Sequence, residues 1–156
     1  ILCYENSPAS KVLLDKLKDS KLSISLVESI TGGALSSEIV KHPGASEVLR
    51  SSNVVYDASA KKQLLGKEIT DDWNKLTEDL ANASLKQSNA DISLAVLGEA
   101  GPISSSHNKV GEIFISISNE SKTENIKHNL RGNRQEIINR AVNNCIWDLL
   151  NFIKKL

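Results

Sequence analysis

The order in which helical and extended patterns follow one another constrains the fold of this chain more than any other feature. The predicted elements begin with a helix that starts near Pro8 and has Val12, Leu13 and Leu17 on one face. They continue with a strand at 23–27, a helix at 34–40, a strand at 52–56, helices at 58–65 and 71–87, a strand at 92–97, paired strands at 111–118 and 124–130, and a helix at 134–155. Helices alternate with strands early, and a hairpin comes late. This order predicts the α/β class, with residues 1–156 forming a single three-layer α/β/α domain around a mixed sheet.

Helix ends can be assigned from individual residues. Ser7 is expected to cap the first helix, with Pro8 in its first turn, and Pro43 is expected to end the second. Gly66 is expected to end the helix at 58–65, and Thr70 is expected to cap the helix at 71–87.

Composition limits the partners of the chain. Its 156 residues carry 19 basic and 19 acidic side chains, so no general attraction to nucleic acid or anionic lipid is expected. No apolar run reaches the length of a membrane span, and no signal segment opens the chain, which favours a cytoplasmic protein without membrane contact. Because the chain begins at Ile1 and lacks methionine, we expect a processed product or a piece of a longer polypeptide.

Cysteine and histidine usage argues against metal or thiol chemistry. Cys3 and Cys145 are expected to be reduced thiols, and the apolar stripe of the last helix predicts that Cys145 is buried and inert. The three histidines have no ligand spacing. We therefore predict no metal site and no cofactor.

Three segments could carry chemistry. The turn Thr31-Gly32-Gly33 lies between a strand and a helix, where glycines and free N–H groups suit an anion, although a tight turn alone explains it equally well. The loop Gly98 to Pro102 follows a buried strand, where ligands sit in α/β folds. Ser46, Tyr56 and Lys61 form the third set, but from composition alone they are better explained as a helix cap, a strand residue and a solvated side chain.

Taken together and in order, these segments resemble the CinA C-terminal domain family, also described as nicotinamide mononucleotide deamidase. The matching segments are Glu28-Ser29-Ile30-Thr31-Gly32-Gly33, Pro43-Gly44-Ala45-Ser46, Val55-Tyr56 with Ala60-Lys61, Gly98-Glu99-Ala100-Gly101-Pro102, Lys109-Val110-Gly111 and Gly132-Asn133-Arg134. The resemblance covers about residues 13–150.

The resemblance implies a metal-free serine–lysine amidohydrolase that converts nicotinamide mononucleotide to nicotinic acid mononucleotide and ammonia. Ser46 would be the nucleophile, Lys61 the general base and Tyr56 an aid to proton transfer. Substrate-binding roles would fall to Glu28, Ser29, Thr31, Gly32, Gly33, Gly98, Ala100, Gly101 and Arg134. The resemblance also suggests a homodimer or a larger homo-oligomer.

The chain departs from the family pattern around the expected substrate. Leu97 stands where a hydroxyl residue is usual, and Glu99 puts a carboxylate where an apolar residue is usual. Ser104 and Ser105 replace a glycine pair, and the segment after Gly66 is shorter than in the family. Two alternatives therefore stand beside the amidase: an inactive relative that binds or regulates, and an amidase acting on a different small amide.

Overall fold

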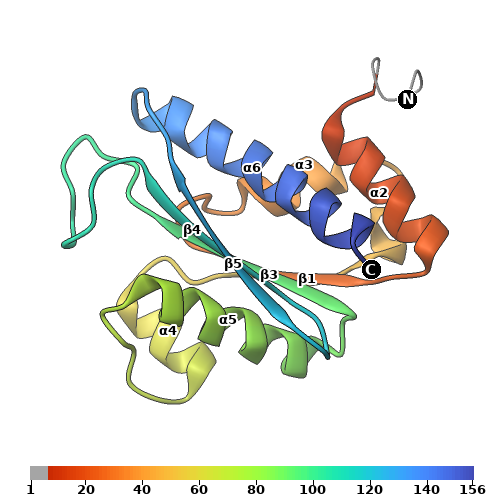
Figure 1. Ribbon diagram of the computed structural model, residues 1–156, viewed down its shortest axis with the longest axis horizontal. Coiled ribbons are helices and arrows are strands. Elements are labelled where there is room, and N and C mark those ends of the chain that lie inside the picture. The colour runs from red at the N-terminus through yellow and green to blue at the C-terminus, as the bar shows by residue number, and fades with distance from the viewer. Residues whose placement is uncertain (1–6) are drawn as a thin grey trace.

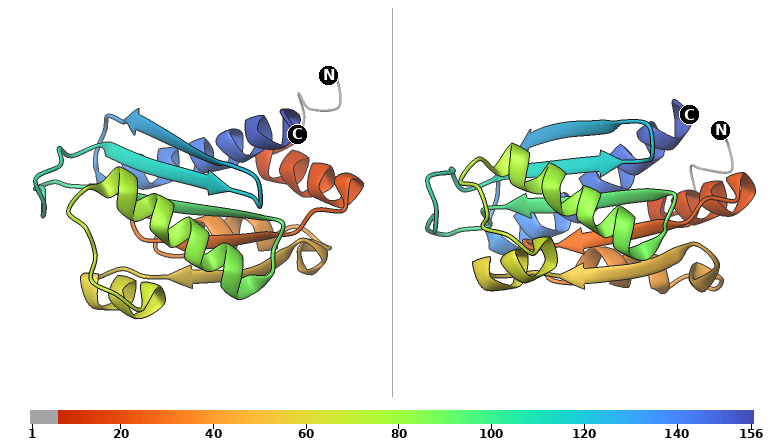
Figure 2. Two further views of the ribbon diagram at one scale, coloured as in Figure 1. Left: turned by 60° about the horizontal axis from the view of Figure 1, so that its bottom comes forward. Right: turned by 90° about the horizontal axis from the view of Figure 1, so that it is seen from below.

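A five-stranded sheet lies between two layers of helices in the computed structural model, which describes residues 7–156 (Figure 1). One face of the sheet carries α2 (Ala9–Ser20), α3 (Ala34–Val40) and α6 (Arg134–Lys154). The other face carries α4 (Ala58–Leu65) and α5 (Trp73–Ser88), as both views in Figure 2 also show. The predicted three-layer α/β/α arrangement is confirmed.

The sheet combines a parallel half with an antiparallel half. Its strands are β1 (Ile24–Glu28), β2 (Leu49–Val54), β3 (Ile92–Gly98), β4 (Glu112–Ser118) and β5 (Thr123–Asn129), in the spatial order β2-β1-β3-β4-β5. The first three strands are parallel, and β4 and β5 run antiparallel to their neighbours. The predicted mixed sheet is therefore present, and β1, β2 and β3 end at the same edge.

Alternating side chains of the strands build two separate cores. Leu26 and Leu94 are directed into the first core, between the sheet and the α2, α3 and α6 layer. Their neighbours Val27 and Ala95 belong to the second core, under α5. Full burial of a large apolar side chain contributes about 1.5–3 kcal/mol, so both faces of the sheet are held firmly.

The structure corrects the predicted strand at 52–56. Strand β2 begins at Leu49, three residues before the predicted start. Residues 49–53 are mostly polar because β2 is an edge strand whose faces are only partly covered. The apolar pair Val54-Val55 comes at its end, where the Val55 N–H donates to the Glu28 carbonyl oxygen at 2.8 Å. An apolar pattern indicates a buried strand, and because β2 is only partly buried, its sequence lacks that pattern.

Two predicted helix caps are also corrected. The cap position of α2 is Pro8, with no side-chain cap, so Ser7 does not have the expected role. The cap of α5 is Asp72, whose carboxylate accepts hydrogen bonds from Asn74 and Lys75, whereas Thr70 accepts the N–H of Asp72 itself. A carboxylate fits this position because it also matches the positive end of the helix dipole.

Cys145 is buried as predicted, and burial raises the pKa of its thiol well above the ordinary range. Cys3 lies outside the described residues. Within residues 7–156, no helix is both long and apolar enough to cross a membrane, and no group of three metal-binding side chains comes together.

Candidate functional site

A cavity of about 540 Å³ opens at the edge where β1, β2 and β3 end. Figure 1 shows the 99–110 segment projecting beyond the sheet at this end, close to where α6 begins. The polar or charged side chains that line the cavity are Ser29, Tyr56, Asp57, Lys61, Glu99, Ser105 and Arg134. With Trp73, which also lines the cavity, residues from five separate parts of the chain meet in one place.

Lys61 is a buried lysine in the first turns of α4, with 7% of its surface exposed. Its Nζ donates to the carbonyl oxygen of Tyr56 at 3.2 Å, and it forms no ion pair with any residue from 7 to 156. Burial lowers the pKa of Lys61, and the attraction of the nearby Asp57 carboxylate only partly offsets this effect. A lysine with a lowered pKa is a better proton acceptor near neutral pH than an exposed one.

Ser29 is the first residue after β1 and is held by the sheet. Its backbone N–H donates to the Val96 carbonyl oxygen at 3.2 Å, which continues the pairing of β1 with β3. The residue is 8% exposed and lines the cavity together with Lys61. Its hydroxyl forms no hydrogen bond with the described part of the chain, so it is available to a ligand.

Arg134 connects the beginning of α6 to the cavity. Its Nη2 donates to the Tyr56 hydroxyl oxygen at 2.9 Å, and its Nη1 donates to the Gly101 carbonyl oxygen. A capping box between Asn133 and Glu136 fixes the start of this helix. Because both acceptors are neutral, the positive charge of Arg134 remains free to attract an anion.

The structure separates Ser46 from Lys61, contrary to the arrangement that the resemblance implies. Ser46 lies in the short 3-10 helix Ala45–Glu47, before β2, whereas Tyr56 and Lys61 come after it. A strand of six residues spans about 20 Å, so the two ends of β2 lie at opposite edges of the sheet. Ser46 is exposed and does not line the cavity.

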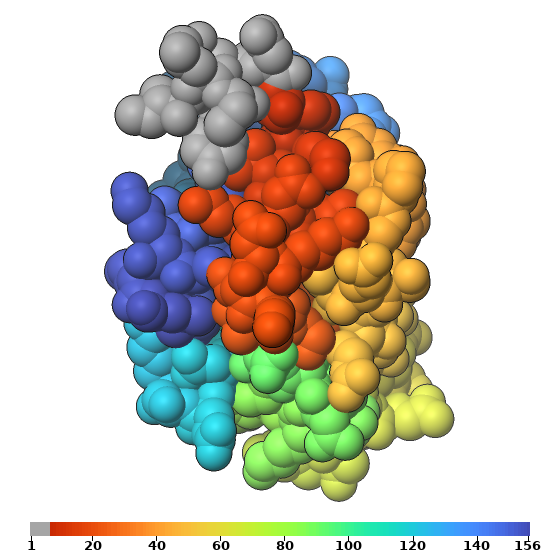
Figure 3. All heavy atoms as spheres, turned by 90° about the vertical axis from the view of Figure 1, so that its right-hand side faces the viewer, coloured from red at the N-terminus to blue at the C-terminus, as the bar shows by residue number. Residues whose placement is uncertain are grey.

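The surroundings of Ser46 belong to the packing of α2. The carboxylate of Glu47 lies 3.9 Å from Nζ of Lys18, near the end of α2. Figure 3 shows this end of the molecule, with α2 lying between α6 on one side and the 40–50 segment on the other. Nothing in this arrangement within one chain brings the Ser46 hydroxyl to the Lys61 amine.

Glu28 also differs from its expected substrate-binding role, because its carboxylate is fully buried and engaged. It accepts six hydrogen bonds, given by the hydroxyls of Thr31, Ser36 and Ser52 and by the N–H groups of Gly33, Leu35 and Ser36. Burial acts to raise the pKa of Glu28, but the hydrogen bonds from Thr31 and Ser36 outweigh it and the pKa is lowered. The carboxylate holds the start of α3 and has no surface for a ligand.

The Thr31-Gly32-Gly33 turn is arranged around this carboxylate. The Thr31 hydroxyl donates to Glu28 at 2.6 Å, and the Gly33 N–H donates to it at 3.2 Å. Both glycines have positive φ values, +56° for Gly32 and +100° for Gly33, which other residues rarely adopt. None of the three lines the cavity, so the glycines are explained by a turn around a buried carboxylate.

The loop after β3 does reach the cavity. Gly98, Ala100 and Gly101 all line it, as the sequence predicts. A Cβ on Gly98 would come within 2.5 Å of Cδ1 of Ile113 and 3.1 Å of the Glu112 carbonyl oxygen, so a side chain there would force its neighbours to move. Leu97, one residue earlier, is buried in the second core and does not line the cavity, which places the missing hydroxyl under α5 and not in the site.

Sequence reasoning missed two features of this site. It gave Ser29 a binding role and did not consider it as a nucleophile, although its position directly after a buried strand was a signal. It also passed over Trp73, a half-buried residue that lines the cavity at the start of α5. Trp73 falls in the shortened segment after Gly66, where no family motif drew attention to it.

Comparisons with known proteins agree on one family. The family described as CinA C-terminal domain matches residues 6–153. A CinA-like protein from Endomicrobium trichonymphae is 34% identical over 157 residues, covering 96% of this chain and 36% of that protein. Another from Thermotoga maritima is 33% identical over 153 residues, covering 92% of this chain and 37% of that protein. The chain thus spans little more than a third of these curated relatives.

A solved structure gives the same result. The crystal structure of a competence or damage-inducible protein from Enterobacter asburiae has a TM-score of 0.87 to this chain at 26% identity. The alignment covers 93% of this chain and 96% of that one.

Proposed function

This chain belongs to the CinA C-terminal domain family, and from that premise we propose that it hydrolyses the amide of nicotinamide mononucleotide. The products would be nicotinic acid mononucleotide and ammonia. One observation carries the proposal: Ser29, Tyr56 and the buried Lys61 line the same cavity. The nucleophile in this proposal is Ser29, because Ser46 lies at the other edge of the sheet.

The reaction begins with the neutral amine of Lys61, which takes the proton of the Ser29 hydroxyl while Oγ attacks the amide carbon. The C–N bond then breaks, and ammonia leaves with the proton that Lys61 returns. Water attacks the acyl–enzyme, Lys61 accepts a proton from it, and the Ser29 oxygen leaves and is reprotonated. No metal is required, since the lowered pKa of Lys61 supplies the base.

Arg134 and Tyr56 would position the substrate. The guanidinium of Arg134 has no carboxylate partner among residues 7–156, so a phosphate of the substrate would find an unneutralised cation at the cavity. The Tyr56 hydroxyl accepts from Arg134 at 2.9 Å and keeps its own proton for donation to the substrate or to the leaving group.

The test is to measure ammonia release from nicotinamide mononucleotide by Ser29→Ala, Lys61→Ala and, as the matched serine control, Ser46→Ala. Ser29→Ala and Lys61→Ala are expected to lower kcat/KM by about 10³-fold or more, because each removes a group that acts in the transition state. Ser46→Ala is expected to stay within about two-fold of the unmodified protein.

Loss of activity in Ser46→Ala with full activity in Ser29→Ala would contradict the assignment. Binding of the nucleotide by calorimetry without any ammonia release would instead identify a binding or regulatory module. Release from another small amide, but not from this nucleotide, would identify an amidase of different specificity. A homodimer or larger assembly stays a prediction, which sedimentation would test.

A further inference from the structure

Glu99 is a buried carboxylate at the cavity without a positively charged partner in the described chain. It is 4% exposed, and it accepts hydrogen bonds from the Ser106 hydroxyl at 2.6 Å and from the Ser105 hydroxyl at 3.0 Å. The Ser105 N–H donates to it at 3.2 Å. All of these donors are neutral, so they orient the carboxylate but leave its charge uncompensated.

The neighbouring Glu112 provides a contrast. Its carboxylate forms an ion pair with Lys127 at 2.6 Å. The two basic side chains that line the cavity form no such ion pair with Glu99, since Lys61 donates to the Tyr56 carbonyl oxygen and Arg134 donates to neutral oxygens. A buried carboxylate without a counter-ion is costly, and a cation bound in the cavity would relieve that cost.

Trp73 supplies a flat, apolar wall to the same cavity. Its ring meets that of Phe114 edge to face, with 5.9 Å between centroids and 78° between planes. Phe114 is itself buried in the second core, so this contact holds the indole in place before any ligand arrives. The face of an indole attracts cations as well as planar rings.

From these two residues, we propose that the cavity contains a subsite selective for a planar, positively charged ring, with Trp73 against the ring and Glu99 as its counter-charge. This inference rests on the proposed function and deepens it, because the pyridinium ring of a nicotinamide nucleotide carries such a charge. It gives a role to one departure from the family pattern, the carboxylate at 99. Ser105 and Ser106 are part of the same subsite, because their hydroxyls donate to the Glu99 carboxylate and orient it.

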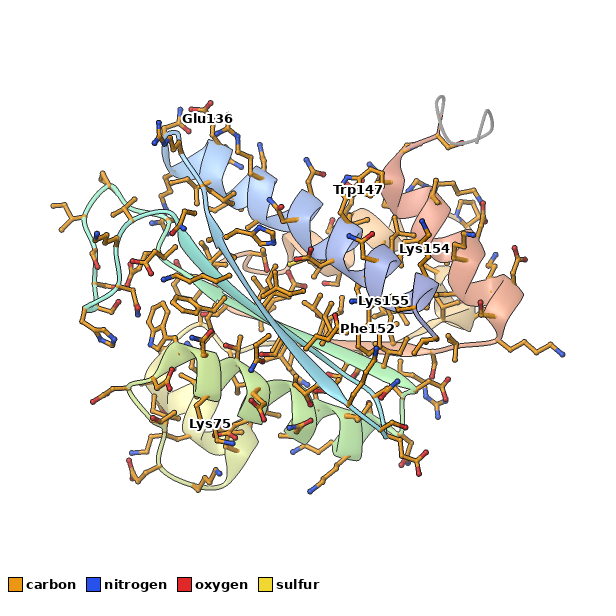
Figure 4. All side chains as sticks on the ribbon, viewed as in Figure 1. Lys75, Glu136, Trp147, Phe152, Lys154 and Lys155 are labelled. Carbon is orange, nitrogen blue, oxygen red and sulfur yellow. The ribbon has the colours of Figure 1, made fainter. Side chains whose placement is uncertain are left out.

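Binding is measured by tryptophan fluorescence, which does not depend on turnover. The chain has two tryptophans, and Trp147 lies on α6, in the opposite layer from Lys75 of α5, two residues from Trp73 (Figure 4). Trp147 is 57% exposed and Trp147→Phe leaves Trp73 as the sole reporter. The probes are 1-methylnicotinamide, a cationic ring with an amide, and nicotinamide, its neutral counterpart.

In the Trp147→Phe protein, 1-methylnicotinamide is expected to quench with saturation and to bind about ten-fold more tightly than nicotinamide. Glu99→Gln keeps the shape and removes the charge, and it is expected to bring the two affinities within about three-fold of each other. Ser106→Ala, which keeps the carboxylate, should retain most of the preference. Trp73→Phe, with Trp147 as reporter, should show only linear, collisional quenching.

Equal affinity for the two probes in the Trp147→Phe protein would overturn the proposal, as would a preference that survives Glu99→Gln. If Glu99→Gln does not fold, the ratio in the parent protein still decides the question. A preference for the cation without ammonia release would uphold this inference and contradict the amidase, and ammonia release without the preference would do the reverse.

Discussion

Glu28 and Ser29 are consecutive residues at the end of β1, yet they face two very different environments. Glu28 is fully buried on the α3 side, where six hydrogen bonds close around its carboxylate. Ser29 lies at the cavity beside α4, and its hydroxyl has no hydrogen-bond partner in the described chain. The comparison shows that the end of one strand has two roles: on its closed side, the Glu28 carboxylate fixes the backbone, and on its open side, at the cavity, the Ser29 hydroxyl is left without a hydrogen-bond partner in the described chain.

The largest expected effect comes from breaking the closed side with Glu28→Ala. Removing the carboxylate leaves several buried N–H and hydroxyl donors unsatisfied, so we expect the free energy of unfolding to fall by about 3–5 kcal/mol. Urea unfolding at pH 7 measures this loss. Because the pKa of Glu28 is lowered in the folded state, its contribution is present above the ordinary pKa of a carboxyl and is lost as the pH falls through the lowered value.

The control is Glu120→Ala, a change of an exposed glutamate in a turn, which should alter stability by less than about 0.5 kcal/mol. A Glu28→Ala protein as stable as this control would mean that the six hydrogen bonds do not hold the start of α3.

A smaller effect is expected from Leu97→Thr, which tests whether residue 97 belongs to the cavity. If the family's hydroxyl at this position acted in the site, restoring it should raise activity. Because Leu97 is 2% exposed and packed under α5, we expect a loss of about 2–3 kcal/mol in stability and no gain in kcat/KM. Urea unfolding and ammonia release measure the two quantities, and a faster enzyme would place residue 97 in the site after all.

The smallest effect should come from Asp57→Asn, which tests how the charge of Asp57 changes the pKa of Lys61 at the cavity. Asp57 raises the pKa of Lys61 against the larger effect of burial, so removing its charge should lower that pKa further. In the proposed mechanism the base is the neutral amine, so activity is expected to rise with pH through the pKa of Lys61. We expect this rising limb of kcat/KM to move to lower pH by less than about one unit.

Asparagine keeps the capping role of Asp57 at α4, so the helix should be unaffected. A limb that moves to higher pH, or does not move at all, would argue that Lys61 is not the base.

Much of the fold could be predicted because it depends on local patterns. Helices α3 and α4 occupy the predicted ranges 34–40 and 58–65, Gly66 ends α4 as expected, and β4 follows the alternation of Ile113, Ile115 and Ile117. Strand β2 was misplaced because an edge strand does not need the apolar side chains that mark burial. The loop at Gly98 to Gly101 was predicted to reach a ligand, and it does line the cavity.

The site was less predictable, because its members are selected by position in space. Ser46 and Ser29 both belong to suggestive motifs, and no pattern in the sequence says that Ser46 lies before β2 whereas Ser29 lines the same cavity as Lys61. The resemblance assigned the Glu28 carboxylate to substrate binding, but in the folded chain the turn at Thr31 encloses that carboxylate.

The sequence by itself determined the element order, the two apolar faces of the sheet and the family, because these depend on residue type and spacing along the chain. The tertiary structure alone decided which serine lines the same cavity as Lys61, that Lys61 is buried enough for its pKa to fall, and that no cation from residues 7–156 pairs with Glu99. These properties depend on desolvation and on contacts between residues far apart in sequence, which only the packed chain brings together.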